Sequence, residues 1–198
     1  MKKTKAVFFD IDGTIWDSRN FIPESTIKAI HQLRANGHYT FLCSGRTRGY
    51  IHNPQLLEIG FDGIVSGCGT MIEYRNQVVY YKEIERELAE FTVKTVREHG
   101  FSAILEGRNY IYMDDDEFKN DFFAKKLKSE LGDHLRTIKD HWGTWEISKL
   151  SCATVDADTE NCFKILSPYY NYMIHNSSVV EIIPKGHHKG TAIVKVCD

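Results

Sequence analysis

The sequence predicts an α/β protein in which a separate α+β segment interrupts a parallel sheet. In residues 1–69, apolar strand-like runs alternate with helical segments, a pattern typical of parallel strands joined by right-handed crossovers. Residues 70–183 instead read as hairpins and amphipathic helices. Acidic and hydroxyl side chains follow the first two strands, and open α/β sheets bind ligands beyond the carboxyl ends of their strands.

The first part begins with a strand over residues 6–11, AVFFDI, which is apolar on both faces and is predicted to be fully buried. A helix starts at Pro23 and stops at Asn36-Gly37. The remaining expected elements are a strand over 38–44, a broken helical segment over 46–60 and a strand over 62–69.

The second part opens with a hairpin over 70–81 that turns at Arg75-Asn76. We expect helices near 85–99, 116–131 and 158–166, and strands near 101–106, 109–113, 146–155, 170–175 and 179–183. A last helix begins at Lys189 or Gly190. The predicted domains are therefore residues 1–82 with 184–198, and residues 83–183.

Composition excludes some classes of partner. The net charge of −2 over 198 residues argues against a broad basic face for nucleic acid. No apolar stretch approaches the roughly 18 residues that a membrane span requires, so we expect neither nucleic acid nor membrane as a partner. Five cysteines without C-x-x-C spacing predict a reduced, cytoplasmic protein with buried thiols. The sequence makes no prediction of oligomeric state.

The candidate chemistry lies at the strand ends. Asp10 and Asp12 end the first strand, and Ser44 ends the second. Gly13 and Gly45 leave backbone without a Cβ, so an anion can approach N–H groups closely. Two carboxylates at this spacing can divide a phosphoryl transfer, because one can attack phosphorus while the other moves a proton.

Such a site needs positive charge. Two carboxylates and a phosphate dianion within about 4 Å repel by roughly 4 kcal/mol for each pair of unit charges at an effective dielectric near 20. Mg²⁺ held by carboxylates and the substrate phosphate would relieve this repulsion. Lys189 is a second candidate cation, because it stands at the start of a helix, where N–H groups also favour anions.

Three motifs resemble those of the haloacid dehalogenase-like (HAD) superfamily of phosphatases. FFDIDGT (8–14) resembles the first motif, FLCSGR (41–46) the second, and EIIPKGHHKGTAI (181–193) the third. The insertion between the second and third motifs is similar to the cap of the Cof-type members, subfamily IIB. The resemblance covers nearly the whole chain and implies a Rossmann-like parallel-sheet core with an inserted α+β cap domain.

The resemblance also implies a reaction. Asp10 would be the nucleophile and a Mg²⁺ ligand. Asp12 would be the general acid/base, and its backbone carbonyl would also contact the metal. The reaction would be Mg²⁺-dependent hydrolysis of a small-molecule phosphate monoester through an aspartyl-phosphate, with a sugar phosphate, a nucleotide or a cofactor phosphate as substrate.

Further roles come from the same resemblance. Ser44 would hydrogen-bond the transferring phosphoryl group, helped by backbone N–H groups around Ile11 and Gly45. Lys189 would neutralise the nucleophile and the phosphate. Arg46 stands where a contact to the substrate or to the cap is expected.

The family's fourth motif, an acidic cluster that ends another strand, has no counterpart in residues 190–198. We therefore expect the chain to be C-terminally truncated or incompletely represented, with an incomplete core domain. Residues 6–11 would then form a long hydrophobic sheet edge. The acids Asp114, Asp115 and Asp116 are predicted to be a solvated helix start.

Several alternatives stay open. A phosphomutase of the same fold, or a weakly active or inactive phospho-ligand binder, would use the same strand-end residues. A receiver domain is disfavoured, because the third strand ends in Val65-Ser66-Gly67 without an acceptor aspartate. His187 and His188 are interpreted as loop residues rather than metal ligands, since no carboxylate or cysteine stands at ligand spacing.

Overall fold

The computed structural model describes residues 3–118, 122–176 and 178–198. The chain divides into two compact units, Met1–Tyr81 with His187–Asp198, and Lys82–Gly186. The expected boundaries after residues 82 and 183 fall within three residues of these divisions. The assignment of the two units as catalytic core and cap stays a prediction.

The first unit contains a five-stranded sheet. Its strands follow each other in sequence order: β1 (Ala6–Phe9), β2 (Tyr39–Cys43), β3 (Gly63–Ser66), β4 (Met71–Tyr74) and β5 (Gln77–Tyr81). Pairing is parallel from β1 to β3 and antiparallel from β3 to β5. The parallel sheet predicted for the first 69 residues is therefore confirmed. Arg75 and Asn76 both have positive φ, 49° and 62°, as a tight hairpin turn requires.

Full burial of the first strand is a wrong prediction. All four residues of β1 are half-buried, although Ile11 in the loop that follows is fully buried. The reason is position in the sheet. Within the described residues β1 pairs with β2 alone and forms the edge, so one side of its backbone has no neighbouring strand.

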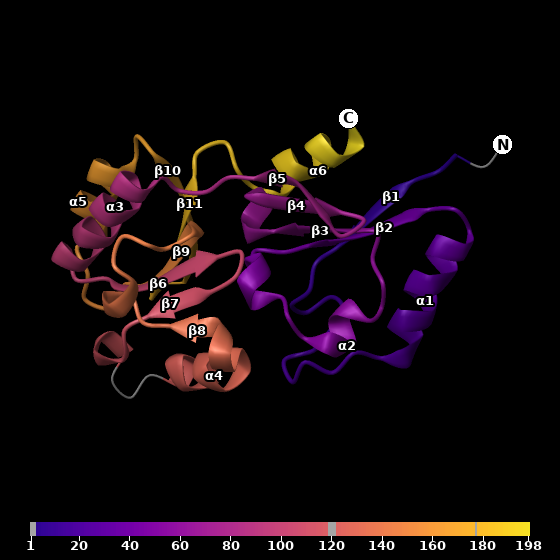
Figure 1. Cartoon of the computed structure of the whole chain (residues 1–198), viewed down its shortest axis with the longest axis horizontal. Helices are drawn as coiled ribbons and strands as arrows, with labels where there is room; N and C mark the ends of the chain where they lie inside the picture. The colour runs from indigo at the N-terminus through magenta and orange to yellow at the C-terminus, as the bar shows by residue number, and fades with distance from the viewer. Residues whose placement is uncertain (1–2, 119–121, 177) are drawn as a thin grey trace. The chain divides into compact units, whose positions relative to one another are not determined.

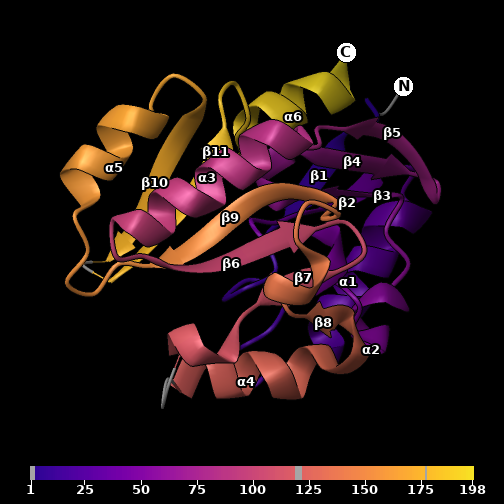
Figure 2. The same ribbon diagram turned by 60° about the vertical axis from the view of Figure 1, so that its left-hand side comes forward.

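Helices cover both faces of this sheet (Figures 1 and 2). On one face, α1 (Glu24–Ala35) and α2 (Pro54–Leu57) pack against strand residues such as Leu42. On the other face, α6 (Lys189–Cys197) packs against Val65 and Ile72. The predicted segment 46–60 is a 3₁₀ turn over Arg48–Tyr50 followed by α2.

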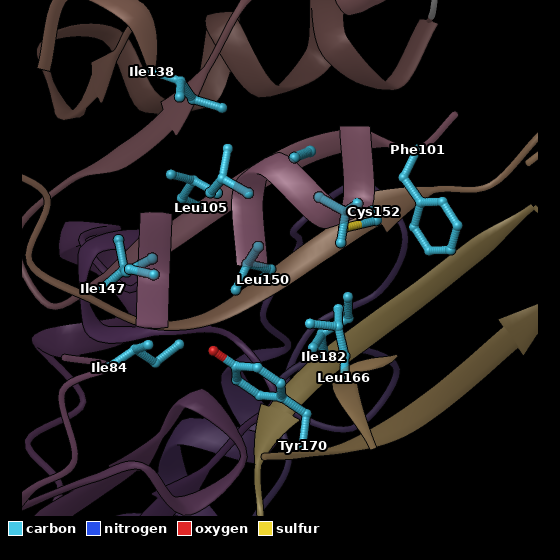
Figure 3. Packing of buried hydrophobic residues seen from close by; sticks show 14 of the residues in the cluster. Ile84, Phe101, Leu105, Ile138, Ile147, Leu150, Cys152, Leu166, Tyr170 and Ile182 are labelled. Atoms are coloured by element: carbon cyan, nitrogen blue, oxygen red, sulfur yellow. The ribbon is translucent and has the colours of Figure 1, made fainter. Parts of the chain in front are cut away.

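The second unit is built on a mixed sheet. Its order is β10 (Tyr170–Asn176), β11 (Val179–Pro184), β9 (Ile147–Ala153), β6 (Ser102–Gly107), β7 (Ile111–Met113) and β8 (Leu135–Arg136). The helices are α3 (Arg86–Glu98), α4 (Phe122–Leu131) and α5 (Thr159–Leu166). Side chains of α3 and α5 pack on the sheet, as Figure 3 shows for Leu166 beside Tyr170 and Ile182.

One prediction in this unit needs correction. Asp114 is not solvated: it is buried, and it accepts hydrogen bonds from Arg97 Nη2 at 2.9 Å and from the Lys139 N–H at 3.2 Å. A buried carboxylate needs such partners, whereas Asp115 stays exposed and pairs with Lys128 at 2.7 Å. Within the predicted helix 116–131, residues 119–121 lie outside the described residues.

Two sequence-wide expectations bear on the structure. No helix in the described part of the chain has the length and hydrophobicity that crossing a bilayer requires. All five cysteines are free thiols, of which Cys197 is exposed and the other four are buried.

Candidate active site

The loop after β1 is closed on itself by backbone hydrogen bonds. The carbonyl of Ile11 accepts from the N–H groups of Thr14 at 3.3 Å, Ile15 at 3.1 Å and Trp16 at 3.3 Å. Gly13 has φ +71°, in the left-handed region that favours glycine, and its N–H donates to the Trp16 carbonyl at 3.1 Å. The loop therefore holds the two aspartates, residues 10 and 12, on a fixed backbone.

Asp10 is paired with Lys189. The Nζ of Lys189 lies 2.9 Å from Oδ1 of Asp10, and each side chain is close to two-fifths exposed. The N–H of Ile11 donates to the same Oδ1 at 2.9 Å. The structure thus brings the predicted nucleophile and the predicted lysine into contact, and it places the Ile11 N–H on the carboxylate.

Lys189 is the first residue of α6, and its neighbours fix the start of that helix. His188 is the N-cap: its Nδ1 accepts from the Thr191 N–H at 3.2 Å, and the Thr191 hydroxyl accepts from the His188 N–H at 3.1 Å. A Cβ on Gly69 would come within 2.8 Å of Ala192 Cβ and of the His188 carbonyl oxygen. The helix start therefore rests directly on the turn that follows β3.

The end of β2 lies beside the same ion pair. Burial raises the pKa of the Cys43 thiol to about 11, while the charges of Lys189 and Asp10 act on it in opposite directions. Ser44 follows directly and is buried; its N–H donates to the Val65 carbonyl at 2.9 Å, and its Oγ accepts from the Arg46 N–H at 3.1 Å. Gly45 occupies the backbone position between these two bonds.

Arg46 binds Asp12. Its Nε donates to Oδ2 and its Nη2 to Oδ1, both at 2.8 Å, which is a bidentate guanidinium–carboxylate pair. The indole Nε1–H of Trp16 also donates to Oδ1, at 3.1 Å. No motif of the sequence assigns a role to Trp16. The available signal was an aromatic donor four residues after the second aspartate.

A known protein family matches the sequence that forms this site. The sequence profile described as haloacid dehalogenase-like hydrolase matches residues 7–198. The chain belongs to that family.

Relatives of this haloacid dehalogenase-like hydrolase differ in length. YkrA of Bacillus subtilis, described as a suspected phosphatase, is 43% identical over 77 residues, which cover 39% of this chain and 30% of YkrA. The subclass IIB sugar phosphatase BT4131 superposes with a TM-score of 0.76 at 21% identity, over 98% of this chain and 75% of that chain. A haloacid dehalogenase-like hydrolase from Bacteroides thetaiotaomicron gives 0.79 at 18% identity, over 98% and 76%. At these identities the two structures show the fold alone.

The donor set of this haloacid dehalogenase-like hydrolase can be compared with the needs of magnesium. Among the residues that the structure describes, no group of three or more His, Cys, Asp or Glu gathers around one point. Mg²⁺ commonly binds proteins through one or two carboxylates, with water and substrate phosphate completing its shell. The Asp10 carboxylate and the Asp12 backbone carbonyl would supply the oxygen donors of such a site, and the Asp10 carboxylate is in contact with Lys189.

An apolar hollow of about 540 Å³ elsewhere on the first unit is a weaker candidate site. It is lined by the aromatic residues Tyr39, Phe41, Tyr74 and Tyr80 together with Lys195. The hollow contains no carboxylate, and its lining includes none of the predicted site residues. The strand-end cluster is therefore the candidate active site on chemical grounds.

Proposed function

We propose that this haloacid dehalogenase-like hydrolase is a phosphatase that hydrolyses a small-molecule phosphate monoester with the help of Mg²⁺. The single observation that carries the proposal is the contact of 2.9 Å between Lys189 Nζ and Asp10 Oδ1 at the end of a parallel strand. A carboxylate nucleophile attacking an anionic phosphate needs a cation that does not block both of its oxygens. The ammonium lies on one oxygen, as this requires.

The first half of the reaction forms an aspartyl-phosphate. Two hydrogen-bond donors fall on Oδ1 of Asp10, so we assign the attack to Oδ2. Oδ2 forms a bond to phosphorus while the bond from phosphorus to the ester oxygen breaks. Protonated Asp12 gives its proton to that leaving oxygen, which departs as an alcohol.

The second half restores the enzyme. Asp12, now a carboxylate, takes a proton from water as the water oxygen attacks phosphorus. The bond between phosphorus and Asp10 breaks, inorganic phosphate leaves, and Asp12 is again protonated for the next cycle. One aspartate thus serves as acid and then as base, since its protonation state after the first half is the one that the second half needs.

Charge balance explains the proposed metal. The two carboxylates, Asp10 and Asp12, are matched by two cations, Lys189 and Arg46. With Asp12 protonated, as the first half of the reaction requires, a phosphate dianion still leaves one negative charge that these residues do not compensate. Mg²⁺ held by the Asp10 carboxylate, the Asp12 carbonyl and the substrate would supply two positive charges and polarise the phosphoryl oxygens.

The remaining roles concern positioning. We assign contact with the phosphoryl group to the Ser44 hydroxyl and the Gly45 N–H, and orientation of the nucleophile to the Ile11 N–H, which donates to Asp10. Arg46 is assigned to an anionic group of the substrate. Residues 82–186 would act as the cap that selects among sugar phosphates, nucleotides and cofactor phosphates. The free thiols support a reducing, cytoplasmic location.

The test uses p-nitrophenyl phosphate as a general substrate. Asp10→Asn removes the nucleophilic oxygen charge, so phosphate release with MgCl₂ should fall by roughly 10³-fold or more. Acid-quenched wild-type protein should carry phosphate on the peptide that contains Asp10. Asp133→Asn, the same change at an exposed aspartate of the second unit, is the matched control and should keep full activity.

Four results would contradict the proposal. Activity that survives Asp10→Asn would exclude the nucleophile, and activity unaffected by EDTA would exclude the metal. A wild-type protein that binds phosphate but releases none from the ester would be a phospho-ligand binder. Transfer of phosphate to a second sugar position without net release would instead identify a phosphomutase.

A further inference from the structure

Trp16 and Arg46, which come from different loops, both donate hydrogen bonds to the carboxylate of Asp12. Trp16 belongs to the same closed loop, four residues on, and its indole donates to Oδ1 at 3.1 Å. Arg46 comes from the loop after β2 and donates to both oxygens. One donor is neutral and the other is a cation, so the two respond differently to an arriving anion.

Trp16 is firmly held. Its side chain is buried, at 6% exposure, and it packs with Ile11 and Ile15 in the core between the sheet and α1. A buried indole N–H requires an acceptor, and a carbonyl inside the core would satisfy it. Here the acceptor is instead a carboxylate whose side chain is 54% exposed. A side chain fixed in the core, Trp16, thus donates a hydrogen bond to a carboxylate that is exposed to solvent.

Arg46 is held by stacking on aromatic rings as well as by its bidentate hydrogen bonds to Asp12. Its guanidinium carbon lies 4.5 Å from the ring centre of Tyr50 and 5.3 Å from that of Trp16. Cation–π contacts of this kind do not depend on which anion the guanidinium binds. Arg46 can therefore exchange one bidentate acceptor for another while it stays over the rings. Phosphate oxygens match the guanidinium fork as well as a carboxylate does.

We propose that Trp16 is a positioning residue for Asp12, and that Arg46 leaves Asp12 for the anionic group of the substrate. This inference rests on the proposed role of Asp12 as acid/base. Departure of Arg46 removes the Nε bond from Oδ2 and the Nη2 bond from Oδ1. The indole bond on Oδ1 remains and keeps the carboxyl group in its rotamer. Oδ2 then faces the leaving oxygen or the water with which it exchanges a proton.

The first test does not depend on turnover. In ¹⁵N-labelled protein, the indole signal of Trp16 is the one lost in Trp16→Phe, and the side-chain Nε–H signal of Arg46 is the one lost in Arg46→Lys. The Asp12→Asn variant provides a reference: the chemical shift of the Trp16 indole N–H when its acceptor is weaker. Titration with inorganic phosphate and MgCl₂ should change the chemical shift of the Arg46 Nε–H. The chemical shift of the Trp16 indole should not approach the value that it has in Asp12→Asn, because the indole keeps its bond to Asp12.

The outcomes separate this inference from the proposed function. Phosphate that moves the backbone signals of Gly45 and Lys189 but leaves the Arg46 signal unchanged would overturn the exchange and keep the phosphate site. An indole signal that moves to its Asp12→Asn position would overturn the role of Trp16. Absence of any shift at saturating phosphate would overturn the proposed function, and this inference with it.

Kinetics on p-nitrophenyl phosphate supply the second test. Trp16→Phe keeps an aromatic ring but removes the donor, so kcat should fall about tenfold with KM nearly unchanged. Arg46→Lys cannot form the fork, so it should chiefly raise KM, also by about tenfold. Trp145→Phe removes a buried indole donor to the Ile138 carbonyl in the second unit and is the matched control. A fall in kcat equal to that of the control would overturn the role of Trp16.

Discussion

Two carboxylates two positions apart in one loop, Asp10 and Asp12, bind two very different cations. Asp10 binds the ammonium of Lys189 through one oxygen, whereas Asp12 binds the guanidinium of Arg46 through both. Lysine acts as a point charge and leaves the second oxygen of its partner accessible, while arginine occupies a carboxylate edge-on. The choice of cation therefore agrees with the proposed attack by Asp10 and the proposed release of Asp12 from Arg46.

The thiol beside this ion pair should be inert. Burial raises the pKa of Cys43 to about 11, so roughly one thiol in a thousand is ionised at pH 8. Cys197 is exposed. Iodoacetamide at pH 8 should therefore modify Cys197 and spare Cys43 in the folded protein, as read by peptide mass spectrometry.

A matched variant makes this prediction sharper. Cys197→Ser should leave the folded protein almost unreactive, because the other four thiols are buried. Unfolding in urea should then expose Cys43 to the reagent. Labelling of Cys43 in the folded variant at the rate of a free thiol would show that the end of β2 is open to solvent.

Residue-scale features divide into those that sequence could predict and those that it could not. Asp10, Ser44 and Lys189 were predicted because each stands where a strand ends or a helix begins, and parallel strands bring such positions to one edge. Trp16 acquires its role from the closed loop, in which the backbone bends its indole back toward Asp12. That bend depends on hydrogen bonds that no residue pattern specifies.

At the scale of elements, α6 matters because its first residue is Lys189, and His188 caps it. Histidine at an N-cap is unusual, since Asn, Asp, Ser and Thr are the preferred residues. His188→Ala should lower the free energy of unfolding by about 1 kcal/mol, because the Thr191 N–H loses its acceptor. His188→Asn restores an acceptor and should recover most of that loss.

Two measurements check the cap. Urea unfolding gives the difference in free energy between the two variants, and hydrogen exchange at the Thr191 amide reports the cap itself. Exchange should quicken in His188→Ala and return toward the wild-type rate in His188→Asn. Equal stability of both variants and the wild type would mean that packing on Gly69 alone fixes the helix start.

The helices of the protein were predicted better from the sequence pattern than its strands. Periodicity predicted the helices α1 and α3 well, because the buried apolar residues of a helix recur every three or four positions. The strand over 6–11 has the composition of a central strand, but β1 is at the edge of the sheet among the described residues, as the missing fourth motif predicted. Composition shows which residues are hydrophobic, whereas the position of a strand in a sheet depends on which other strands pair with it. β8 is two residues long and offers no periodicity at all.

At the scale of the whole molecule, each unit has a hydrophobic core of its own. The core of the second unit joins α3 and α5 to its sheet, and the first unit has separate clusters on the two faces of its sheet. The sequence showed this division through a change of pattern near residue 70. It could not give the exact points at which the chain passes between the units, because residues 82–84 have no regular secondary structure and residues 185–186 form a turn.

Because each unit has its own core, a core substitution in one unit should destabilise that unit and not the other. Leu150 in the second unit and Leu42 in the first are both fully buried, each within the core of its own unit. Replacing a buried leucine by alanine costs about 2–5 kcal/mol through lost burial and the cavity left behind. The cost should fall on the unit that holds the cavity, because local opening follows contiguous packed regions.

Hydrogen exchange followed by mass spectrometry can locate that cost. Leu150→Ala should weaken the protection of β6, β9 and β11 and leave β2 and β3 as in the wild type. Leu42→Ala should do the reverse, so the two variants control for each other. Equal loss of protection in both units from either change would show that the chain opens as one cooperative body. Damage to the second unit would then reach Asp10 and Lys189 as well, and core substitutions anywhere in the chain would alter the candidate active site.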